Sequence, residues 1–113
     1  MENCLFCKII AGDIPSAKVY EDDFCYAFRD INPQAPTHIL VVSKAHVRNI
    51  SEAASLPDDA LAAILRAIGK IAAQEKLENG FRVVTNCGED ACQSVPHLHF
   101  HILGGRPMED KMA

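Results

Sequence analysis

Three histidines alternate with apolar residues in His97-Leu98-His99-Phe100-His101, close to the C-terminal end of the sequence. Successive side chains of a β-strand point to opposite faces, so a strand here would place the three imidazoles on one face. Neutral imidazole is available near pH 7 and can act as a base, a metal ligand or a nucleophile toward phosphorus. An ordinary polar strand face draws on Thr, Lys, Glu and Ser, so this pattern indicates chemistry.

A single zinc ion bound by all three histidines is disfavoured by geometry. At a rise of roughly 3.3 Å per residue, the Cα atoms of His97 and His101 would lie about 13 Å apart. Zinc–nitrogen bonds of about 2.1 Å require ligand nitrogens that converge on one point. We therefore favour a division of tasks, in which one histidine is ligated or oriented, one attacks and one assists.

A second group of reactive side chains lies near the N-terminus, where Cys4 and Cys7 form a C-x-x-C spacing. This spacing allows two thiolates to bind one tetrahedral metal. Two buried thiols on a short apolar helix are an alternative. A thioredoxin-like redox pair is a third interpretation, but the βαβ pattern that would accompany it is missing. A zinc site would need two further ligands, and His46 and His97 have no other predicted task.

Length and charge exclude several classes of protein. The 113 residues carry 11 Lys+Arg against 15 Asp+Glu, which predicts one mildly acidic domain. That charge argues against binding to a nucleic-acid polymer, and no apolar run approaches the roughly 18 residues of a membrane span. The first residues lack the pattern of a secretory signal, and five cysteines is an odd number. We therefore expect a cytoplasmic protein with free thiols.

The rest of the sequence predicts the elements that would position these side chains. Segments rich in β-branched and aromatic residues predict strands at 17–21, 24–30, 37–43, 81–85 and 95–103. A short apolar run predicts a helix of about two turns at 4–10. The order of helices and strands predicts an α+β fold with a mainly antiparallel sheet.

One long helix follows the third strand. Ser55 with Asp58 three residues later resembles a capping box, and Asn79-Gly80 resembles a stop signal. Helical spacing connects the apolar residues of one stripe, Leu61, Ile64, Leu65, Ile68, Ile71 and Ala72.

The alternating histidines, followed by apolar residues, resemble the signature of the histidine triad (HIT) superfamily. Other segments resemble its Hint branch and occur in the same order, namely residues 30–38, Val83-Val84-Thr85-Asn86, Gln93-Ser94 and Gly104-Gly105-Arg106. The similarity runs from residue 4 to about residue 106. It implies one HIT domain over residues 1–113, with a five-stranded antiparallel sheet, one long and one short helix, and a homodimer that joins two sheets into ten strands.

The resemblance also implies a hydrolase that binds purine nucleotides and cleaves nucleoside phosphoramidates, or related mixed anhydrides, through a nucleotidylated histidine. His99 would be the nucleophile, His101 would contact the phosphate, and Ser94 would lie near the leaving group. His38 would keep His99 in a competent tautomer, and Asp30 would accept hydrogen bonds from the ribose. The remaining candidates are Phe6, Phe28, Ile14 and Ile31 for the base, and Asn86 and Gln93 for the phosphate. No organic cofactor is expected.

Several bacterial histidine-triad proteins, and galactose-1-phosphate uridylyltransferases of the same superfamily, are similar around the cysteines as well. They pair a C-x-x-C with a downstream histidine and with the first histidine of the triad. Cys4, Cys7, His46 and His97 match that pattern. The resemblance therefore implies a closed, structural Cys₂His₂ zinc site that leaves the other two triad histidines for phosphorus.

Three positions depart from the Hint pattern. Cys92 stands where a glycine usually precedes Gln-Ser, Pro96 precedes the triad, and the tail 107–113 lacks the Trp-Pro-Pro-Gly-like ending that shapes leaving-group preference. Two other interpretations stay open: a non-catalytic nucleotide-binding or zinc-stabilised scaffold protein, and a diadenosine-polyphosphate hydrolase of the Fhit type. Gly104-Gly105-Arg106 favours the Hint branch.

Overall fold

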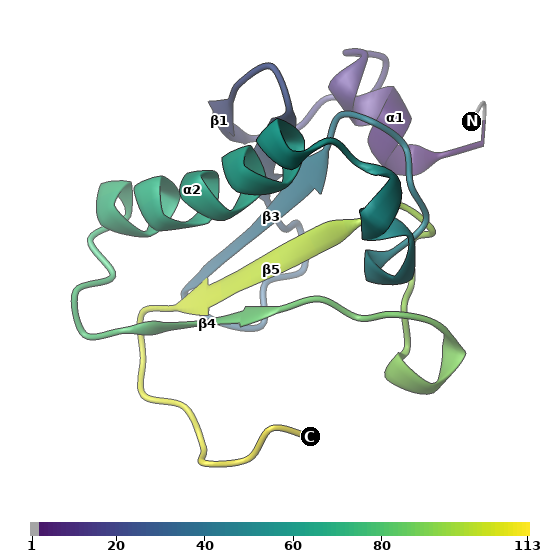
Figure 1. Ribbon diagram of the computed structural model, residues 1–113. Coiled ribbons are helices and arrows are strands. Elements are labelled where there is room, and N and C mark those ends of the chain that lie inside the picture. Colours follow the sequence, from purple (N-terminus) through teal and green to yellow (C-terminus); the bar gives the residue numbers. More distant parts are fainter. Residues whose placement is uncertain (1–2) are drawn as a thin grey trace.

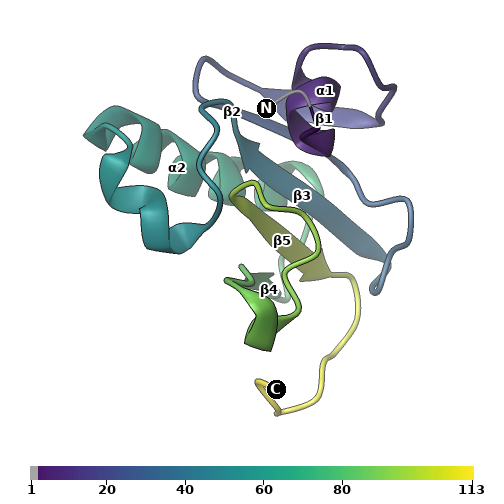
Figure 2. The ribbon, with the colours of Figure 1, turned by 90° about the vertical axis from the view of Figure 1, so that its right-hand side faces the viewer.

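One antiparallel sheet of five strands organises the protein, as the computed structural model of residues 3–113 shows (Figure 1). Met1 and Glu2, part of the segment without a signal pattern, lie outside the described residues. The strands are β1 (Lys18–Glu21), β2 (Cys25–Arg29), β3 (Thr37–Ser43), β4 (Phe81–Val84) and β5 (His99–Gly104). Their order in the sheet is β1-β2-β3-β5-β4, so β1 and β4 form its two edges (Figure 2). The predicted α+β class is confirmed.

Helices cover both faces of the sheet, because alternate strand residues point in opposite directions. The 17-residue helix α2 (Asp58–Gln74) lies against β3, β2 and β1 on one face (Figure 1). Toward α2 the sheet presents Ala27, Ile39, Val41 and Ile102. Toward the six-residue helix α1 (Leu5–Ile10) it presents Tyr26, Phe28, Leu40 and Val42. The register of β3 with β5 pairs Val42 with His99 and Leu40 with His101, so these two histidines lie on the α1 face.

Helix α2 confirms the predicted long helix. Asp58 and Asp59 occupy its first turn, where carboxylates interact favourably with the positive end of the helix dipole. Its buried stripe consists of Ala60, Ile64, Ala67, Ile68, Ile71 and Ala72. Within residues 3–113, none of the helices combines the length and the apolar character that crossing a membrane requires.

Three details of the helix prediction were wrong. Ser55 does not cap α2: it ends a short 3₁₀ helix, Ile50–Ser55, and its hydroxyl donates to the Glu52 carbonyl. Leu65 is 66% exposed, because the stripe contains Ala60 and Ala67 instead. The helix also ends at Gln74 and does not continue to Asn79-Gly80. Lys76, two residues after the helix end, takes a left-handed φ of 58°.

The last strand is shorter than predicted and begins at His99 instead of Val95. Pro96 has no N–H to donate to a strand partner, and the His97 N–H donates back to the Val95 carbonyl at 2.8 Å. The chain therefore bends before β5, and only two triad histidines lie on the strand. Leu98 and Ile102 are buried in the core.

The loop before the triad contains a strained residue. Cys92 adopts the left-handed conformation, with φ 58° and ψ 40°, at the position where the Hint pattern has glycine. That conformation costs a residue with a Cβ about 1–2 kcal/mol, whereas glycine adopts it without a steric penalty.

We predict that Cys92→Gly raises the free energy of unfolding by about 0.5–1 kcal/mol, because the strain relieved exceeds the extra chain entropy of glycine. Urea denaturation measures this change. Cys92→Ala is the matched control, since it removes the thiol but keeps the Cβ, and its stability should stay near that of the wild type. An equal gain in both variants would contradict the backbone explanation.

Candidate active site

Three imidazoles cluster on the α1 face of the sheet. His38 comes from β3, and His99 and His101 come from the adjacent strand β5. The ring centroids of His38 and His101 are 5.1 Å apart, as are those of His99 and His101. His38 and His99 are buried, whereas His101 is half-buried.

The proton of His99 is placed by a main-chain oxygen. His99 Nδ1 lies 2.6 Å from the His97 carbonyl, which can only accept, so the proton is on Nδ1. The Nε2 lone pair of His99 is then free. Burial is the main cause that lowers the pKa of His99, so the ring is neutral at pH 7. A neutral imidazole with a free lone pair can act as a nucleophile.

His38 and His101 form a hydrogen-bonded chain with a defined direction. The Gln34 main-chain N–H donates to His38 Nδ1 at 3.0 Å, so His38 carries its proton on Nε2. That proton is donated to His101 Nδ1 at 2.9 Å, and Asp30 Oδ2 lies 3.4 Å from the same His38 nitrogen. His101 therefore keeps its own proton on Nε2.

This arrangement corrects one sequence-based expectation. His38 was expected to hold the tautomer of His99, but it bonds to His101 instead. The His97 carbonyl holds His99, because the bend at residues 95–97 turns that carbonyl toward the His99 ring.

A hollow of about 340 Å³ opens beside the histidines, within the usual size range of ligand pockets. Its polar lining includes Asp30, Asn32, Ser94, His99 and His101. Its apolar lining includes Leu5, Phe6, Ile9, Ile14, Phe28, Ile31, Leu40 and Val95. Ile31 is 91% exposed although it is a large apolar side chain. The structure thus brings together all four residues predicted for the base with Asp30, Ser94 and two histidines.

Two predicted phosphate ligands do not line this hollow. Gln93 Nε2 donates to the carbonyls of Arg48 and Val95, and its Oε1 accepts from the Gly88 N–H, so its amide braces the loop. Asn86 is half-buried on the way from β4 to that loop. Sequence reasoning missed Leu5 and Ile9, although Ile9 follows Phe6 by three residues and so lies on the same side of α1.

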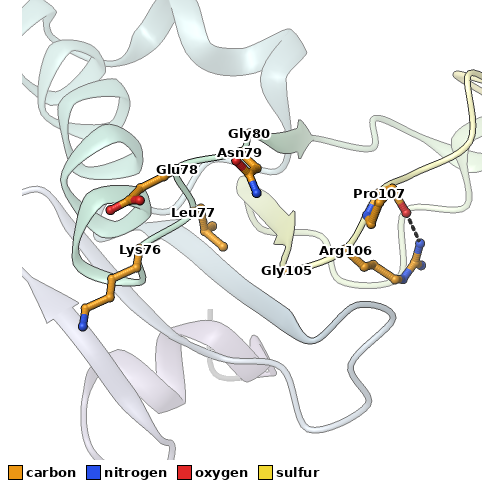
Figure 3. Close-up of a pocket in the computed structure, with 8 residues that line it drawn as sticks. All are labelled: Lys76, Leu77, Glu78, Asn79, Gly80, Gly105, Arg106 and Pro107. Carbon is orange, nitrogen blue, oxygen red and sulfur yellow. Dashed lines mark hydrogen bonds between the residues drawn. The ribbon is translucent and has the colours of Figure 1, made fainter.

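A larger hollow of about 470 Å³ lies between the end of α2 and the end of β5 (Figure 3). Its lining residues are Lys76–Gly80 and Gly105–Pro107. None of them is a histidine, cysteine, serine or threonine. The reactive groups are those of the 340 Å³ hollow, which we call the histidine pocket.

A second cluster gathers Cys4, Cys7, His46 and His97, whose ligand atoms all lie within 4.8 Å of one another. Cys4 Sγ is 3.2 Å and Cys7 Sγ is 3.6 Å from His97 Nδ1, and His46 Nδ1 is 3.3 Å from Cys7 Sγ. Tetrahedral zinc places such atoms about 3.3–3.8 Å apart. His97 Nε2 donates to the Ser43 carbonyl at 2.6 Å, so its Nδ1 lone pair faces the two cysteines. The four side chains fit zinc.

The Cys7 thiol needs a nearby cation to ionise near neutral pH. The pKa of Cys7 is raised to about 11, mainly by burial and then by the hydrogen bond with Cys4 and the negative charge of a Cys4 thiolate. A metal ion reverses this effect, because it stabilises the thiolate directly. Cys4 also caps α1, since its Sγ accepts from the Cys7 N–H. The cluster therefore joins the start of α1 to the segment before β5.

Asp30, His38 and His101 also lie close enough to resemble a metal site. The hydrogen bonds argue against it, because His38 accepts at Nδ1 and carries its proton on Nε2. No lone pair of His38 remains for a metal.

Comparison with known proteins identifies the family. The HIT domain family matches residues 11–108, which is most of the chain. The chain belongs to the HIT family. The resemblance inferred from the triad and its neighbouring segments is therefore confirmed.

Individual HIT relatives cover nearly the whole chain. The purine nucleoside phosphoramidase of Escherichia coli K12 is 42% identical over 99% of this chain and 95% of its own length. The 14 kDa zinc-binding protein of Zea mays is 49% identical over 92% of this chain and 83% of its own. A HIT family hydrolase from Clostridium thermocellum matches the fold with a TM-score of 0.92, at 42% identity, over 100% of this chain and 99% of its own. These HIT relatives agree with the expectation of a hydrolase.

The histidine pocket has a titration that can be measured. Burial, followed by the charges of His99 and His38, lowers the pKa of His101 to about 4. In the unfolded chain an imidazole titrates near pH 6.5. Between these values the unfolded chain binds a proton that the folded protein does not. The free energy of unfolding should therefore fall as the pH drops from 6.5 toward 4.

Histidine NMR titration should give His101 a midpoint near pH 4. Urea denaturation at pH 7 and pH 5 should show a smaller loss of stability in His101→Gln than in the wild type. Loss of metal at low pH would destabilise the wild type and His101→Gln alike. The difference between their losses of stability therefore reports on His101 alone. A His101 midpoint near 6.5 would contradict the prediction.

Proposed function

We propose that this chain hydrolyses purine nucleoside phosphoramidates, or related nucleotide anhydrides, through a nucleotidyl intermediate on His99. The observation that carries the proposal is the placement of protons beside the histidine pocket. His99 offers a lone pair at Nε2, and the neighbouring His101 offers an N–H donor. The names of the E. coli phosphoramidase and of the C. thermocellum hydrolase support the substrate class and the hydrolysis.

The reaction proceeds in two displacements. His99 Nε2 attacks phosphorus, the phosphorus–nitrogen bond breaks, and its electron pair leaves with the amine. The amine takes up a proton, which the Ser94 hydroxyl at the pocket wall can donate and then regain from solvent. Water then attacks phosphorus and releases the nucleotide, the His99 imidazole and a proton.

Two hydrogen bonds support charge development in these steps. The nucleotidylated ring is cationic, and the His97 carbonyl accepts its Nδ1 proton at 2.6 Å. The His101 Nε2–H can donate to a phosphoryl oxygen, and His38 keeps that proton in place. His101 is neutral at pH 7, because its pKa is lowered to about 4, so it acts as a donor and not as a cation.

The remainder of the pocket fits a nucleoside. Phe6, Phe28, Ile14 and Ile31 form an apolar slot for the base, and an ordered ligand there would cover the exposed Ile31 side chain. Asp30 accepts one bond from the Asn32 N–H at 2.8 Å. A carboxylate has about four acceptor sites, so Asp30 can also accept from ribose hydroxyls.

We keep Asn86 as a phosphate ligand and propose that Gln93, whose amide braces the loop, holds Ser94 in place.

We also propose that the Cys₂His₂ cluster binds one structural zinc ion. The name of the maize relative, a zinc-binding protein, supports this choice of metal. Zinc, when bound, supplies the charge that keeps both cysteines as thiolates. Cys4, Cys7, His46 and His97 would hold the ion. The side chain of His97 lies beside the cysteines, whereas its carbonyl accepts from His99 Nδ1.

A homodimer and a cytoplasmic location complete the proposal. β4 is an edge strand, and Phe81 and Val83 on it are 42% and 41% exposed. Pairing β4 with the same strand of a second copy would cover this apolar edge and form a ten-stranded sheet. Cysteines 4, 7, 25, 87 and 92 are all free, as in a reducing compartment.

We predict that His99→Ala lowers the hydrolysis of an AMP amide at least about a thousandfold, because the nucleophile is removed. Calorimetry should show that AMP binding persists, because the base and ribose contacts remain. In the wild type, a single-turnover experiment should trap AMP on His99.

Near-normal hydrolysis by His99→Ala would exclude the mechanism. AMP binding without hydrolysis or covalent AMP in the wild type would favour the non-catalytic nucleotide-binding protein. A preference for diadenosine polyphosphates over AMP amides would favour the Fhit type.

We predict one zinc per chain by elemental analysis, and its loss in the double variant Cys4→Ser/Cys7→Ser. The free energy of unfolding should fall when the metal is lost, because metal binding stabilises the folded protein. Cys87→Ser/Cys92→Ser is the matched control and should keep its zinc. Metal-free protein with unchanged stability and activity would exclude a structural zinc.

A further inference from the structure

Arg106 connects two segments that are far apart in the sequence. Its Nη1 donates to the Pro107 carbonyl and its Nη2 donates to the Gln34 carbonyl, each at 3.1 Å. Gln34 lies in the loop between β2 and β3, at residues 30–36. Figure 3 shows the Arg106 side chain beside Pro107 with the first of these bonds drawn. The guanidinium thus ties the end of β5 to the loop that precedes His38.

Gln34 is also the residue that sets the tautomer of His38. Its carbonyl accepts from Arg106, and its N–H donates to His38 Nδ1 at 3.0 Å. The chain of hydrogen bonds continues from His38 Nε2 to His101 Nδ1 at 2.9 Å. One residue therefore joins the surface arginine to the histidine pair.

Losing the Gln34 N–H would change what His101 presents to the pocket. His38 could then carry its proton on Nδ1, and its Nε2 would become an acceptor. His101 would have to place its proton on Nδ1 to keep the bond between the rings. Its Nε2 would then present a lone pair, which repels a phosphoryl oxygen, in place of a donor.

The loop has contacts on both sides of Gln34. On the N-terminal side, the Asn32 N–H donates to Asp30 Oδ1 at 2.8 Å. On the C-terminal side, Gly105 approaches Pro36 so closely that a Cβ on Gly105 would lie 2.9 Å from the proline Cβ. Gln34 itself is exposed, and the Arg106 bond holds it from outside the loop.

We propose that Arg106 is a positioning residue for the reaction at the histidine pocket. It holds Gln34 so that His38 keeps the proton of His101 on Nε2, facing the phosphate. This inference rests on the proposed function in one respect, the contact between His101 and the phosphate. Because that contact matters most when charge develops, Arg106 should affect kcat and leave nucleotide binding nearly unchanged.

The kinetic test compares Arg106→Met with Arg82→Met. Arg82 also donates to two main-chain carbonyls, but these are the carbonyls of Glu109 and Lys111 in the tail and not that of Gln34. We expect kcat for an AMP amide to fall about threefold to tenfold in Arg106→Met, the size of one lost hydrogen bond. KM and the affinity for AMP should change less than about twofold. Arg106→Lys should recover part of kcat, and Arg82→Met should match the wild type.

The direct test is the tautomer, read from the nitrogen chemical shifts of ¹⁵N-labelled histidine. In the wild type and in Arg82→Met, His38 and His101 should both carry the proton on Nε2. In Arg106→Met, both should show a mixture with the Nδ1–H form. Unchanged tautomers in Arg106→Met, or an unchanged kcat, would overturn the proposal.

The two readouts separate this inference from the proposed function. If the wild type does not hydrolyse AMP amides, the proposed function fails. The tautomers of His38 and His101 still report whether Arg106 controls them, with or without a substrate. A shift confined to Arg106→Met supports the positioning role, whereas a shift also in Arg82→Met overturns it.

Discussion

The hydrogen bond from His99 Nδ1 to the His97 carbonyl is the interaction on which the site depends. It places the proton on one ring nitrogen and leaves the lone pair of the other free. The bond exists because Pro96 cannot join a strand and the chain bends before β5. The same bend points the His97 side chain at Cys4 and Cys7. One local departure from strand geometry thus separates the imidazole that faces the cysteines from the imidazole with a free lone pair in the histidine pocket.

Main-chain groups place the protons on each histidine of the cluster. The His97 carbonyl fixes His99, and the Gln34 N–H fixes His38 and, through it, His101. Main-chain groups do not titrate, so the tautomers that they select do not depend on the charge of a neighbouring side chain. Burial lowers the pKa of His99 and His101, so both rings stay neutral at pH 7 and each keeps a single proton.

Much of the fold could be predicted from the sequence, because burial of alternate strand residues and of one helix stripe leaves a periodic pattern. β3 was predicted with its observed bounds, Thr37–Ser43, because the segment is dense in β-branched residues. Errors arose where tertiary contacts overrule local preference. Leu65 fits the helical period but faces outward, and Val95 looks β-prone but precedes the bend at Pro96.

The sequence by itself determined the chemistry available: three alternating histidines, a C-x-x-C pair, and their resemblance to the HIT family. Side-chain types and spacings are local properties, so they can be read without a fold. Only the tertiary structure decided which nitrogen of each ring carries a proton. That choice depends on carbonyls and N–H groups within about 3 Å. The bends at residues 95–97 and 30–36 place two such groups beside the rings, and folding brings His38 against His101 and Arg106 against Gln34 from distant segments.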